Sequence, residues 1–270
     1  MFRSTGSAIL IALAISFAAS CKTWATETPT TRPVVIVELF TSEGCSSCPP
    51  ADNVLADLAT QNAVDGVQII PLGMHVDYWN YLGWGDRFSS PQFSDRQQRY
   101  SQIFNSNEVY TPQMIVDGTE QFVGSDRQKA IAAIVNSAAQ PKGTIAINLM
   151  PDSKDESSVA CKISVDGIDR NGGRAMVVML AITEDDLSSD VPRGENAGQT
   201  LHHAAVVRTL RRVATINPTD TLPFSASTMI SIQPTWRADH IHIAIFVQDP
   251  QSGKILAGGY QRIASPPEQK

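Results

Sequence analysis

The first half of the chain alternates between two patterns of hydrophobic and polar positions. Short apolar runs rich in β-branched residues predict buried strands at Val34–Phe40 and Val67–Met74, and shorter runs predict a hairpin around the turn Asp117-Gly118. Apolar residues at helical spacing, or a Ser-Pro helix start, predict three helices, at 51–61, 90–104 and 125–139. We therefore expect an α/β domain over residues 34–141 with the element order β-α-β-α-β-β-α.

The second half has a different pattern, in which strand-like runs are separated by clusters of turn residues. Seven such runs occur, at 144–149, 158–166, 174–183, 203–214, 226–232, 240–248 and 254–262. Strands at this spacing, with no convincing helix among them, are typical of an antiparallel sandwich. We therefore expect a separate all-β, sandwich-like domain over residues 143–264, followed by a flexible tail at 265–270.

The N-terminal segment has the features of a secretory signal. One positive charge precedes the apolar run Ala8–Ala19, which is too short to span a bilayer and is followed by small residues. We expect a signal peptide over residues 1–25, cleaved after Ser20 or after Ala25, and a linker over 26–33. An alternative is lipid attachment at Cys21, which would hold the protein on a membrane. Either way, the protein is expected to be exported, periplasmic or secreted, where thiols tend to oxidise.

Charge and cysteine content narrow the classes of function. The 270 residues include 21 Lys and Arg against 27 Asp and Glu, a formal net charge of -6, without a basic stripe. Binding to nucleic acid is therefore not expected. Four cysteines are too few to build a disulfide-stapled fold of this length. Cys161 lies in a predicted strand and is expected to be a buried thiol that packs as a small hydrophobic residue.

The other two cysteines form a C-x-x-C pair, Cys45 and Cys48, between a predicted buried strand and a predicted helix. A helix N-terminus stabilises a thiolate, and two intervening residues allow the sulfurs to close a small disulfide. In such pairs the first, more exposed cysteine attacks a substrate disulfide and the second resolves the mixed disulfide. Pro49 and Pro50 are expected to move the helix start towards Pro50, which would weaken the dipole at Cys45.

Several motifs resemble those of a known group of proteins. They are VELFTSEGCSSCPPAD (37–52), HVDYWNYLGW (75–84), DRFSSPQFSDRQ (86–97), YTPQMIVDG (110–118) and PRGENAGQTLHH (192–203). The chain resembles the thioredoxin-like superfamily and, more closely, a family of bacterial predicted secreted proteins, domain of unknown function 1223. The resemblance implies a thioredoxin-like domain plus a β-domain. Chemistry at the cysteine pair is expected to need no dissociable organic cofactor. The resemblance also implies that Cys45 is the nucleophile and Cys48 the resolving thiol.

The same resemblance suggests roles for residues around the pair. Pro112 would be a cis-proline that faces the C-x-x-C, and Thr111 would offer backbone groups to an extended substrate. The alternative is an ordinary trans proline that enters a strand. Glu38 lies seven residues before Cys45, where thioredoxins have an acid at six. Glu38 is therefore a candidate proton acceptor for Cys48, the alternative being an edge carboxylate.

The end of the second predicted strand carries further candidates, because this end of an open α/β sheet faces the ligand crevice. The substrate-binding candidates are His75, Asp77, Tyr78, Trp79 and Tyr110. The alternative is a packed strand end without a binding role. Two cysteines and His75 also suggest copper handling, because Cu(I) accepts thiolate and imidazole ligands.

The predicted β-domain offers weaker signals. His202 and His203 are expected to be core or surface residues, and the loop Arg193–Gly198 to dock on the first domain. Arg208, Arg211 and Arg212 are interpreted as a solvated strand edge.

Together these features favour an exported thiol–disulfide oxidoreductase that acts on protein or peptide disulfides with an unknown protein redox partner. The alternatives are a non-catalytic binding module with a structural Cys45–Cys48 disulfide, and a copper-handling protein that uses His75.

Overall fold

The computed structural model describes residues 32–60, 63–106, 108–152, 155, 157–169 and 173–263. The predicted signal segment with Cys21, and the predicted tail at 265–270, lie outside these residues. Within the described part of the chain, no helix combines the length and the apolar character needed to cross a membrane.

The N-terminal half forms its elements in the predicted order. They are β1 (Val34–Thr41), α1 (Pro49–Ala59), β2 (Gln68–His75), α2 (Pro91–Ile103), β3 (Gln113–Val116), β4 (Glu120–Val123) and α3 (Arg127–Ala138). β1 runs parallel to β2 and antiparallel to β3, which pairs with β4. α2 begins at the Ser-Pro pair, where the Ser90 hydroxyl accepts a hydrogen bond from the Gln92 N–H and Pro91 fills the first helical position.

The C-terminal half consists mainly of strands. They are β5 (Gly143–Pro151), β6 (Ser158–Asp166), β7 (Met176–Glu184), β8 (Leu187–Val191), β9 (Gln199–His203), β10 (Val206–Ile216), β11 (Phe224–Ser231), β12 (Ile241–Gln248) and β13 (Ile255–Arg262). The predicted run at 203–214 covers the end of β9 and most of β10, and β8 was not predicted. β8 and β9 pair only with each other, as a two-stranded hairpin.

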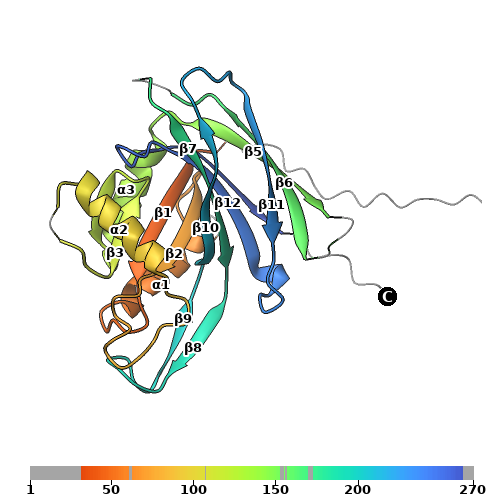
Figure 1. The fold of residues 1–270 in the computed structure, drawn as a ribbon. Coiled ribbons are helices and arrows are strands. Elements are labelled where there is room, and N and C mark those ends of the chain that lie inside the picture. The colour runs from red at the N-terminus through yellow and green to blue at the C-terminus, as the bar shows by residue number, and fades with distance from the viewer. Residues whose placement is uncertain are drawn as a thin grey trace, which may run out of the picture.

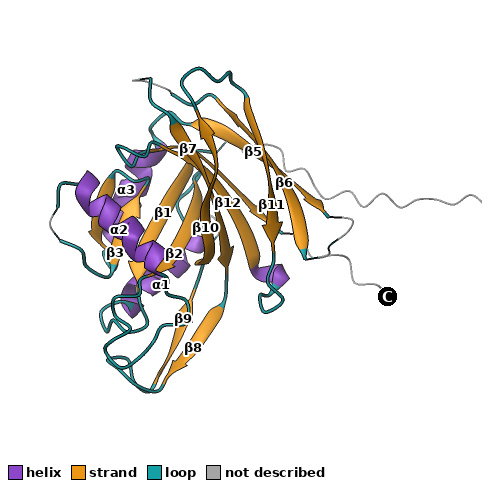
Figure 2. Cartoon of the chain, viewed as in Figure 1, coloured by secondary structure: helices purple, strands orange, loops and turns teal. Residues whose placement is uncertain are grey.

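The two halves share one sheet, so the expectation of a thioredoxin-like α/β domain followed by a separate β-sandwich is wrong. Eleven of the described strands form a mixed sheet in the order β11-β6-β5-β13-β12-β7-β10-β2-β1-β3-β4. The helices gather at the β1–β3 end of this sheet, and β5, β6 and β11 form its other end (Figures 1 and 2). Hydrophobic periodicity reports which faces of a strand are buried and not which strands are its edge partners, so it did not reveal this continuity.

The halves join where β10 meets β2. Val206 pairs with Gly73 in parallel register, and the Gly73 N–H donates a 2.8 Å hydrogen bond to the Ala205 carbonyl. A Cβ added to Gly73 would lie 3.1 Å from the Ala204 carbonyl oxygen. Glycine therefore permits the close backbone approach that makes one sheet out of two predicted domains.

Both faces of β1 are covered, which explains its almost continuous apolar sequence. Val35, Val37 and Leu39 pack against α1 and α3, whereas Ile36 and Phe40 pack under α2 with residues of β2, β10 and β12. The rest of the C-terminal half has its own apolar cluster, which includes Cys161. As expected, Cys161 is a buried free thiol, and burial raises its pKa to about 11.

Candidate functional site

Cys45 and Cys48 form a disulfide between the end of β1 and the start of α1. α1 begins at Pro49 with Cys48 as its N-cap residue, so the helix starts after the second cysteine, as the two prolines suggested. Pro49 and Pro50 have no N–H, and the N–H groups of Ala51 and Asp52 both donate to the Cys48 carbonyl. The first four helix residues therefore leave no N–H to stabilise a sulfur anion.

Both cysteines are buried. The exposed fraction is 1% for Cys45 and 0% for Cys48, whereas Ser46 and Ser47 between them are exposed. The expectation of a more exposed first cysteine is therefore wrong for this conformation. Local sequence could not reveal this burial, because segments far from the C-x-x-C in sequence lie against its loop.

The tip of the β8–β9 hairpin contacts this loop. Glu195 accepts hydrogen bonds from the Ser46 N–H at 3.1 Å and from the Ser46 hydroxyl at 2.7 Å. The buried Asn196 amide donates to the carbonyl oxygens of Glu43, at 2.8 Å, and Cys45, at 3.1 Å. The expected docking of the Arg193–Gly198 loop on the N-terminal half is thus confirmed.

Trp79 and Thr111 approach the loop from another side. The Trp79 indole donates to the Thr111 hydroxyl at 2.8 Å, and a Cβ added to Gly44 would lie 3.1 Å from the Trp79 Cβ. The Thr111–Pro112 peptide bond is cis, as the resemblance implied. Because Gln113 pairs with Phe40, this peptide lies near the end of β1 that leads to Cys45. The substrate-positioning role of Thr111 and Pro112 stays a prediction.

The other predicted substrate-binding residues are tied to α2. Asp77 accepts a hydrogen bond from the Ser94 hydroxyl, and the Tyr78 hydroxyl donates to Gln97. The Gln97 amide in turn donates to the Tyr110 carbonyl. Burial raises the pKa of Tyr78 to about 12, so this phenol stays neutral. These contacts fix the segment after β2, which carries Trp79, against α2.

Glu38 and Cys48 are not brought together. Glu38 alternates along β1 with the residues that face α1, so its side chain lies on the α2 side of the sheet. There its carboxylate accepts hydrogen bonds from Arg96, at 2.5 and 2.9 Å, and from the Tyr100 hydroxyl at 2.6 Å. Glu38 is therefore part of a buried ion pair and is not placed to accept the Cys48 proton.

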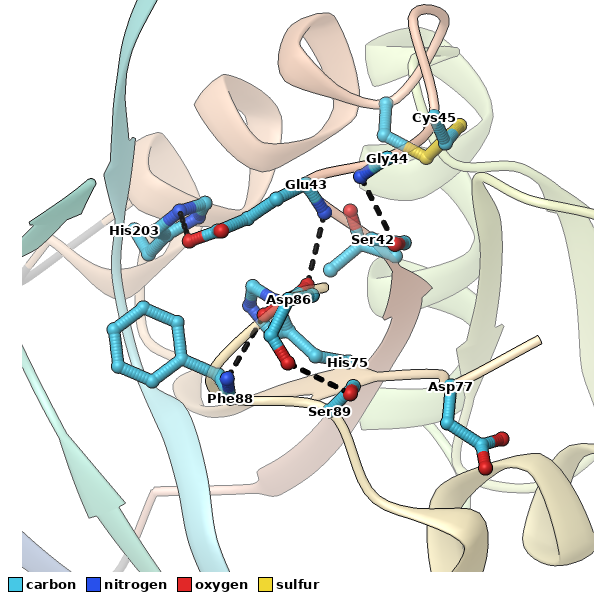
Figure 3. A network of polar contacts seen from close by, with 12 residues as sticks. Ser42, Glu43, Gly44, Cys45, His75, Asp77, Asp86, Phe88, Ser89 and His203 are labelled. Atoms are coloured by element: carbon cyan, nitrogen blue, oxygen red, sulfur yellow. Dashed lines mark hydrogen bonds and ion pairs between the residues drawn. A yellow bond between two sulfur atoms is a disulfide. The ribbon is translucent and has the colours of Figure 1, made fainter. Parts of the chain in front are cut away.

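A cluster of buried acids and histidines lies beneath the disulfide loop instead. We call it the acid–histidine cluster, and it consists of Glu43, Asp52, His75, Asp86 and His203. The parallel strands β1 and β2 end at the same edge of the sheet, where Thr41 pairs with His75. His203 is the last residue of β9. Figure 3 shows His203 beside the Glu43 side chain, and His75 and Asp86 below the chain that leads to Cys45.

Asp86 organises one half of the acid–histidine cluster. Its Oδ2 lies 2.7 Å from the His75 Nδ1 and accepts a 2.9 Å hydrogen bond from the Glu43 N–H, while Oδ1 accepts from the Phe88 N–H (Figure 3). Burial opposes ionisation of this carboxyl, but the His75 charge and the hydrogen bonds from His75, Glu43 and Phe88 together outweigh burial and lower the Asp86 pKa. Burial likewise opposes protonation of His75, but the carboxylates of Asp86, Asp52 and Glu43 together outweigh burial and raise the His75 pKa. The two side chains therefore form an ion pair.

His203 links the other two carboxylates. Its Nε2 lies 3.3 Å from the Glu43 Oε1, and its Nδ1 lies 4.0 Å from the Asp52 Oδ2. Burial favours a neutral Glu43, but the interactions of the carboxylate with His203, Ser189 and Trp84 together outweigh burial and lower the Glu43 pKa. The second Glu43 oxygen accepts a hydrogen bond from the Trp84 indole at 2.7 Å.

The pKa of Asp52 is shifted upwards, in the opposite direction from the pKa values of Glu43 and Asp86. Burial raises its pKa to about 6, although the two histidines and the Thr41 hydroxyl favour the carboxylate. Its backbone N–H donates to the Cys48 carbonyl, so Asp52 lies one helical turn after the second cysteine. Asp52 can therefore take up or release a proton near neutral pH close to the disulfide.

The geometry gives no support to the copper-handling alternative. His75 is paired with Asp86, and its ring packs edge-on against Phe88 and His203. Among the described residues, no group of three or more His, Cys, Asp or Glu side chains is arranged to hold a metal ion.

Sequence reasoning missed most of the acid–histidine cluster as functional residues, although a signal was present. Glu43 and Asp52 lie in the motif 37–52, Asp86 begins the motif 86–97, and His203 ends the motif 192–203. These residues are scattered over the chain, and only the fold brings them together.

Comparison with known proteins finds one matching family and several structures with a similar fold. The model of a family described as "Protein of unknown function (DUF1223)" matches residues 36–248. A crystal structure of a protein from Agrobacterium tumefaciens is similar, with 23% identity, a TM-score of 0.62, and coverage of 87% of this chain and 97% of that one. HBP35 of Porphyromonas gingivalis is similar at 13% identity and a TM-score of 0.61, covering 90% of this chain and 80% of that one. Both likenesses concern the fold alone.

A search among curated proteins finds no match. The comparisons do not confirm membership of the thioredoxin-like superfamily. The family model, however, spans well over half of the 270 residues. The chain belongs to the DUF1223 family of proteins of unknown function.

Proposed function

We propose that the protein is an exported thiol–disulfide oxidoreductase that acts on protein or peptide disulfides through Cys45 and Cys48. The observation that carries this proposal is the disulfide at the start of α1, one helical turn from a buried carboxyl whose pKa is about 6. A disulfide that only braces a fold needs no proton acceptor beside it, whereas thiol–disulfide exchange moves protons in each cycle.

The proposed reaction begins with the reduced protein. The Cys45 thiolate attacks one sulfur of a substrate disulfide, the substrate S–S bond breaks, and the departing substrate sulfur takes up a proton. Cys48 then loses its proton and attacks the Cys45 sulfur. This step releases the second substrate thiol and restores the Cys45–Cys48 disulfide, so the substrate gains two electrons and the protein loses two.

Asp52 is the residue to which we assign the Cys48 proton. The group must be ionised to accept a proton and must hold it weakly enough to release it, which a pKa near 6 allows. We expect Asp52→Asn to slow the release of substrate from the mixed disulfide by about 10²-fold. Asp57→Asn is the matched control, because Asp57 lies on the exposed face of the same helix.

Access to the sulfur requires motion of the β8–β9 hairpin tip. Glu195 and Asn196 hold the loop that carries Cys45, and Cys45 is buried in this arrangement. The tip packs with its own two-stranded sheet and is not part of the eleven-stranded one. In our proposal the tip separates from Ser46 when a substrate approaches.

A second candidate function follows from the same burial. If the tip never separates, the disulfide is structural and the chain is a binding module. The two functions differ in redox potential, because working oxidoreductases have potentials of roughly -120 to -270 mV and structural disulfides lie below about -300 mV.

The deciding experiment is a redox titration of the Cys45–Cys48 pair in thiol–disulfide buffers, with counting of free thiols. Cys45→Ser removes the titration, and Cys161→Ser, which changes only the buried free thiol, is the matched control. A potential within the working range supports the oxidoreductase. A potential well below -300 mV, with no alkylation of Cys45 under mild reduction, would establish the structural disulfide.

A further inference from the structure

A cavity lies on the α2 side of the sheet, in a place that the disulfide chemistry does not use. Its volume is about 420 Å³, and α2 forms one wall while β7, β10 and the end of β12 form the other. The residues that matter for its chemistry are Arg96, Arg99, Arg212, Gln248, Ile103 and Met179. A cavity of this size accommodates a small organic molecule.

The cavity is lined by three arginines and by no carboxylate. Arg96 already has partners, because its guanidinium donates two hydrogen bonds to Glu38, one to the Gln248 side chain and one to the Tyr100 hydroxyl. Arg99 and Arg212 line the cavity and are exposed, and neither has an acidic partner within 4.0 Å among the residues that the structure describes. The cavity is therefore positively charged in a chain whose formal net charge is -6.

The sequence places these cations on surfaces that otherwise face the core. On α2, Gln92, Arg96, Arg99 and Ile103 follow one another at helical spacing and all line the cavity. On β10, Arg212 follows two residues after Leu210, which packs in the apolar cluster under α2, so both point to the same face. The face of the sheet under α2 is therefore apolar at Leu210 and becomes basic at Arg212, where the cavity lies.

Apolar side chains complete the cavity. Met179 lies on β7 between Arg212 of β10 and Phe246 of β12, its direct partners in the two neighbouring strands. Ile103 faces the cavity from the last turn of α2. A ligand with one anionic group and a small apolar body would match both parts of the lining.

We propose that this cavity binds a small organic acid. Its carboxylate pairs with Arg99 and Arg212, and its apolar body lies against Met179 and Ile103. A guanidinium presents its N–H groups in a fixed fork that matches a carboxylate, and an anion relieves the repulsion between two cations that share one opening. The proposal is independent of the redox function, because none of these residues touches the disulfide loop.

Calorimetric titration of the full chain with benzoate, benzamide and inorganic phosphate tests the proposal. Benzoate has the anionic head and an apolar body, benzamide has the same body without the charge, and phosphate has the charge without the body. We expect benzoate to bind at least about tenfold more tightly than benzamide, since a hydrogen-bonded ion pair contributes about 1.4 kcal/mol or more.

The variant Arg99→Gln with Arg212→Gln should weaken benzoate binding about tenfold and leave benzamide binding unchanged. Both side chains are exposed, so the fold is expected to persist, which circular dichroism checks. Arg127→Gln, an exposed arginine on α3 outside the cavity, is the matched control and should bind benzoate like the natural chain. Equal binding of benzoate and benzamide, binding of inorganic phosphate alone, or benzoate binding unaffected by the double substitution would overturn the proposal.

Discussion

Glu195 holds Ser46 by two hydrogen bonds across 149 residues of sequence, one from its backbone N–H and one from its hydroxyl. Ser46 lies between the two cysteines, so the tip of the β8–β9 hairpin is hydrogen-bonded to the disulfide loop. The amide of the neighbouring Asn196 donates a hydrogen bond to the Cys45 carbonyl. These contacts hold the hairpin tip against the loop that carries the two buried cysteines.

Weakening the contact between the hairpin tip and the disulfide loop should make the disulfide easier to reduce. Asn196→Ala removes two buried hydrogen bonds, to the carbonyls of Glu43 and Cys45, which together contribute about 1–3 kcal/mol. We expect the reduction of Cys45–Cys48 by dithiothreitol under native conditions to become about tenfold faster, because the tip separates more often. The rate is measured by quenching with an alkylating reagent and counting modified cysteines.

The control for this prediction is Asn217→Ala, in the loop between β10 and β11, where the side chain contacts Asp220. It should leave the reduction rate unchanged. An equal rate in the natural chain and in Asn196→Ala would mean that the tip does not limit access to the disulfide.

The two prolines after Cys48 should make the pair a weak oxidant. They remove two N–H groups from the helix start, so the thiolate form gains little stabilisation. A destabilised thiolate favours the disulfide, and we expect a potential towards the reducing end of the working range, near about -270 mV. Pro49→Ala restores an N–H and should raise the potential by about 10–30 mV.

Pro91→Ala is the control for the change in redox potential, because Pro91 occupies the first position of α2, whereas the disulfide lies at the start of α1. Titration in thiol buffers measures both variants. A shift of the same size in Pro91→Ala, or no shift in Pro49→Ala, would contradict the role assigned to the helix start.

Asp52 should make stability fall as the pH rises. The pKa of Asp52 is about 6 in the folded chain and 3.8 for a free carboxyl of this type, so the folded state binds the proton more tightly. The stabilisation from this proton is complete below pH 3.8 and is lost as the pH rises through 6. We therefore expect Asp52→Asn to be more stable than the natural chain at pH 7, by about 2–3 kcal/mol, with a difference near zero at pH 4.

Urea unfolding at a series of pH values measures this difference. Asp57→Asn, exposed on the same helix, should show no such pH dependence. If the gain in Asp52→Asn were the same at pH 4 and pH 7, the buried carboxyl would not be the titrating group.

The His75–Asp86 ion pair should contribute strongly to the stability of the folded protein. Asp86→Asn removes the negative charge that faces His75 and disturbs an oxygen that accepts from the Glu43 N–H. Breaking a buried pair on one side costs about 3–5 kcal/mol, so we expect a loss of stability of about 3 kcal/mol at pH 7. Asp95→Asn, on the exposed side of α2, should change stability by less than about 0.5 kcal/mol. Equal losses in the two variants would rule out a structural role for the pair.

Local signals were sufficient for the elements around the disulfide. Continuous apolar runs predicted β1 and β2, and helical spacing or a Ser-Pro start predicted α1, α2 and α3. The prolines after Cys48 predicted a late start of α1. These features depend on residues within a few positions of one another, where periodicity and proline geometry act directly. The Ser-Pro start of α2 is a further example.

Charged residues were harder to interpret from sequence. Glu38 was a candidate partner for Cys48, but alternation along β1 turns it to the other face, where Arg96 of α2 neutralises it. The proton acceptor that we now propose, Asp52, was hidden among the apolar positions of α1. A buried carboxyl and an exposed one look the same in a sequence, because burial depends on what packs over them.

The sequence by itself determined the strand–disulfide–helix unit at Cys45 and Cys48 and the order of the elements in the first half of the chain. Only the tertiary structure decided that both halves share one sheet, that Glu195 and Asn196 bind the disulfide loop, and that His203 lies beside Glu43 and Asp52. The physical reason is distance along the chain. Periodicity, capping and proline act over a few residues, whereas edge pairing at Gly73, hairpin docking and buried ion pairs join segments far apart in the sequence.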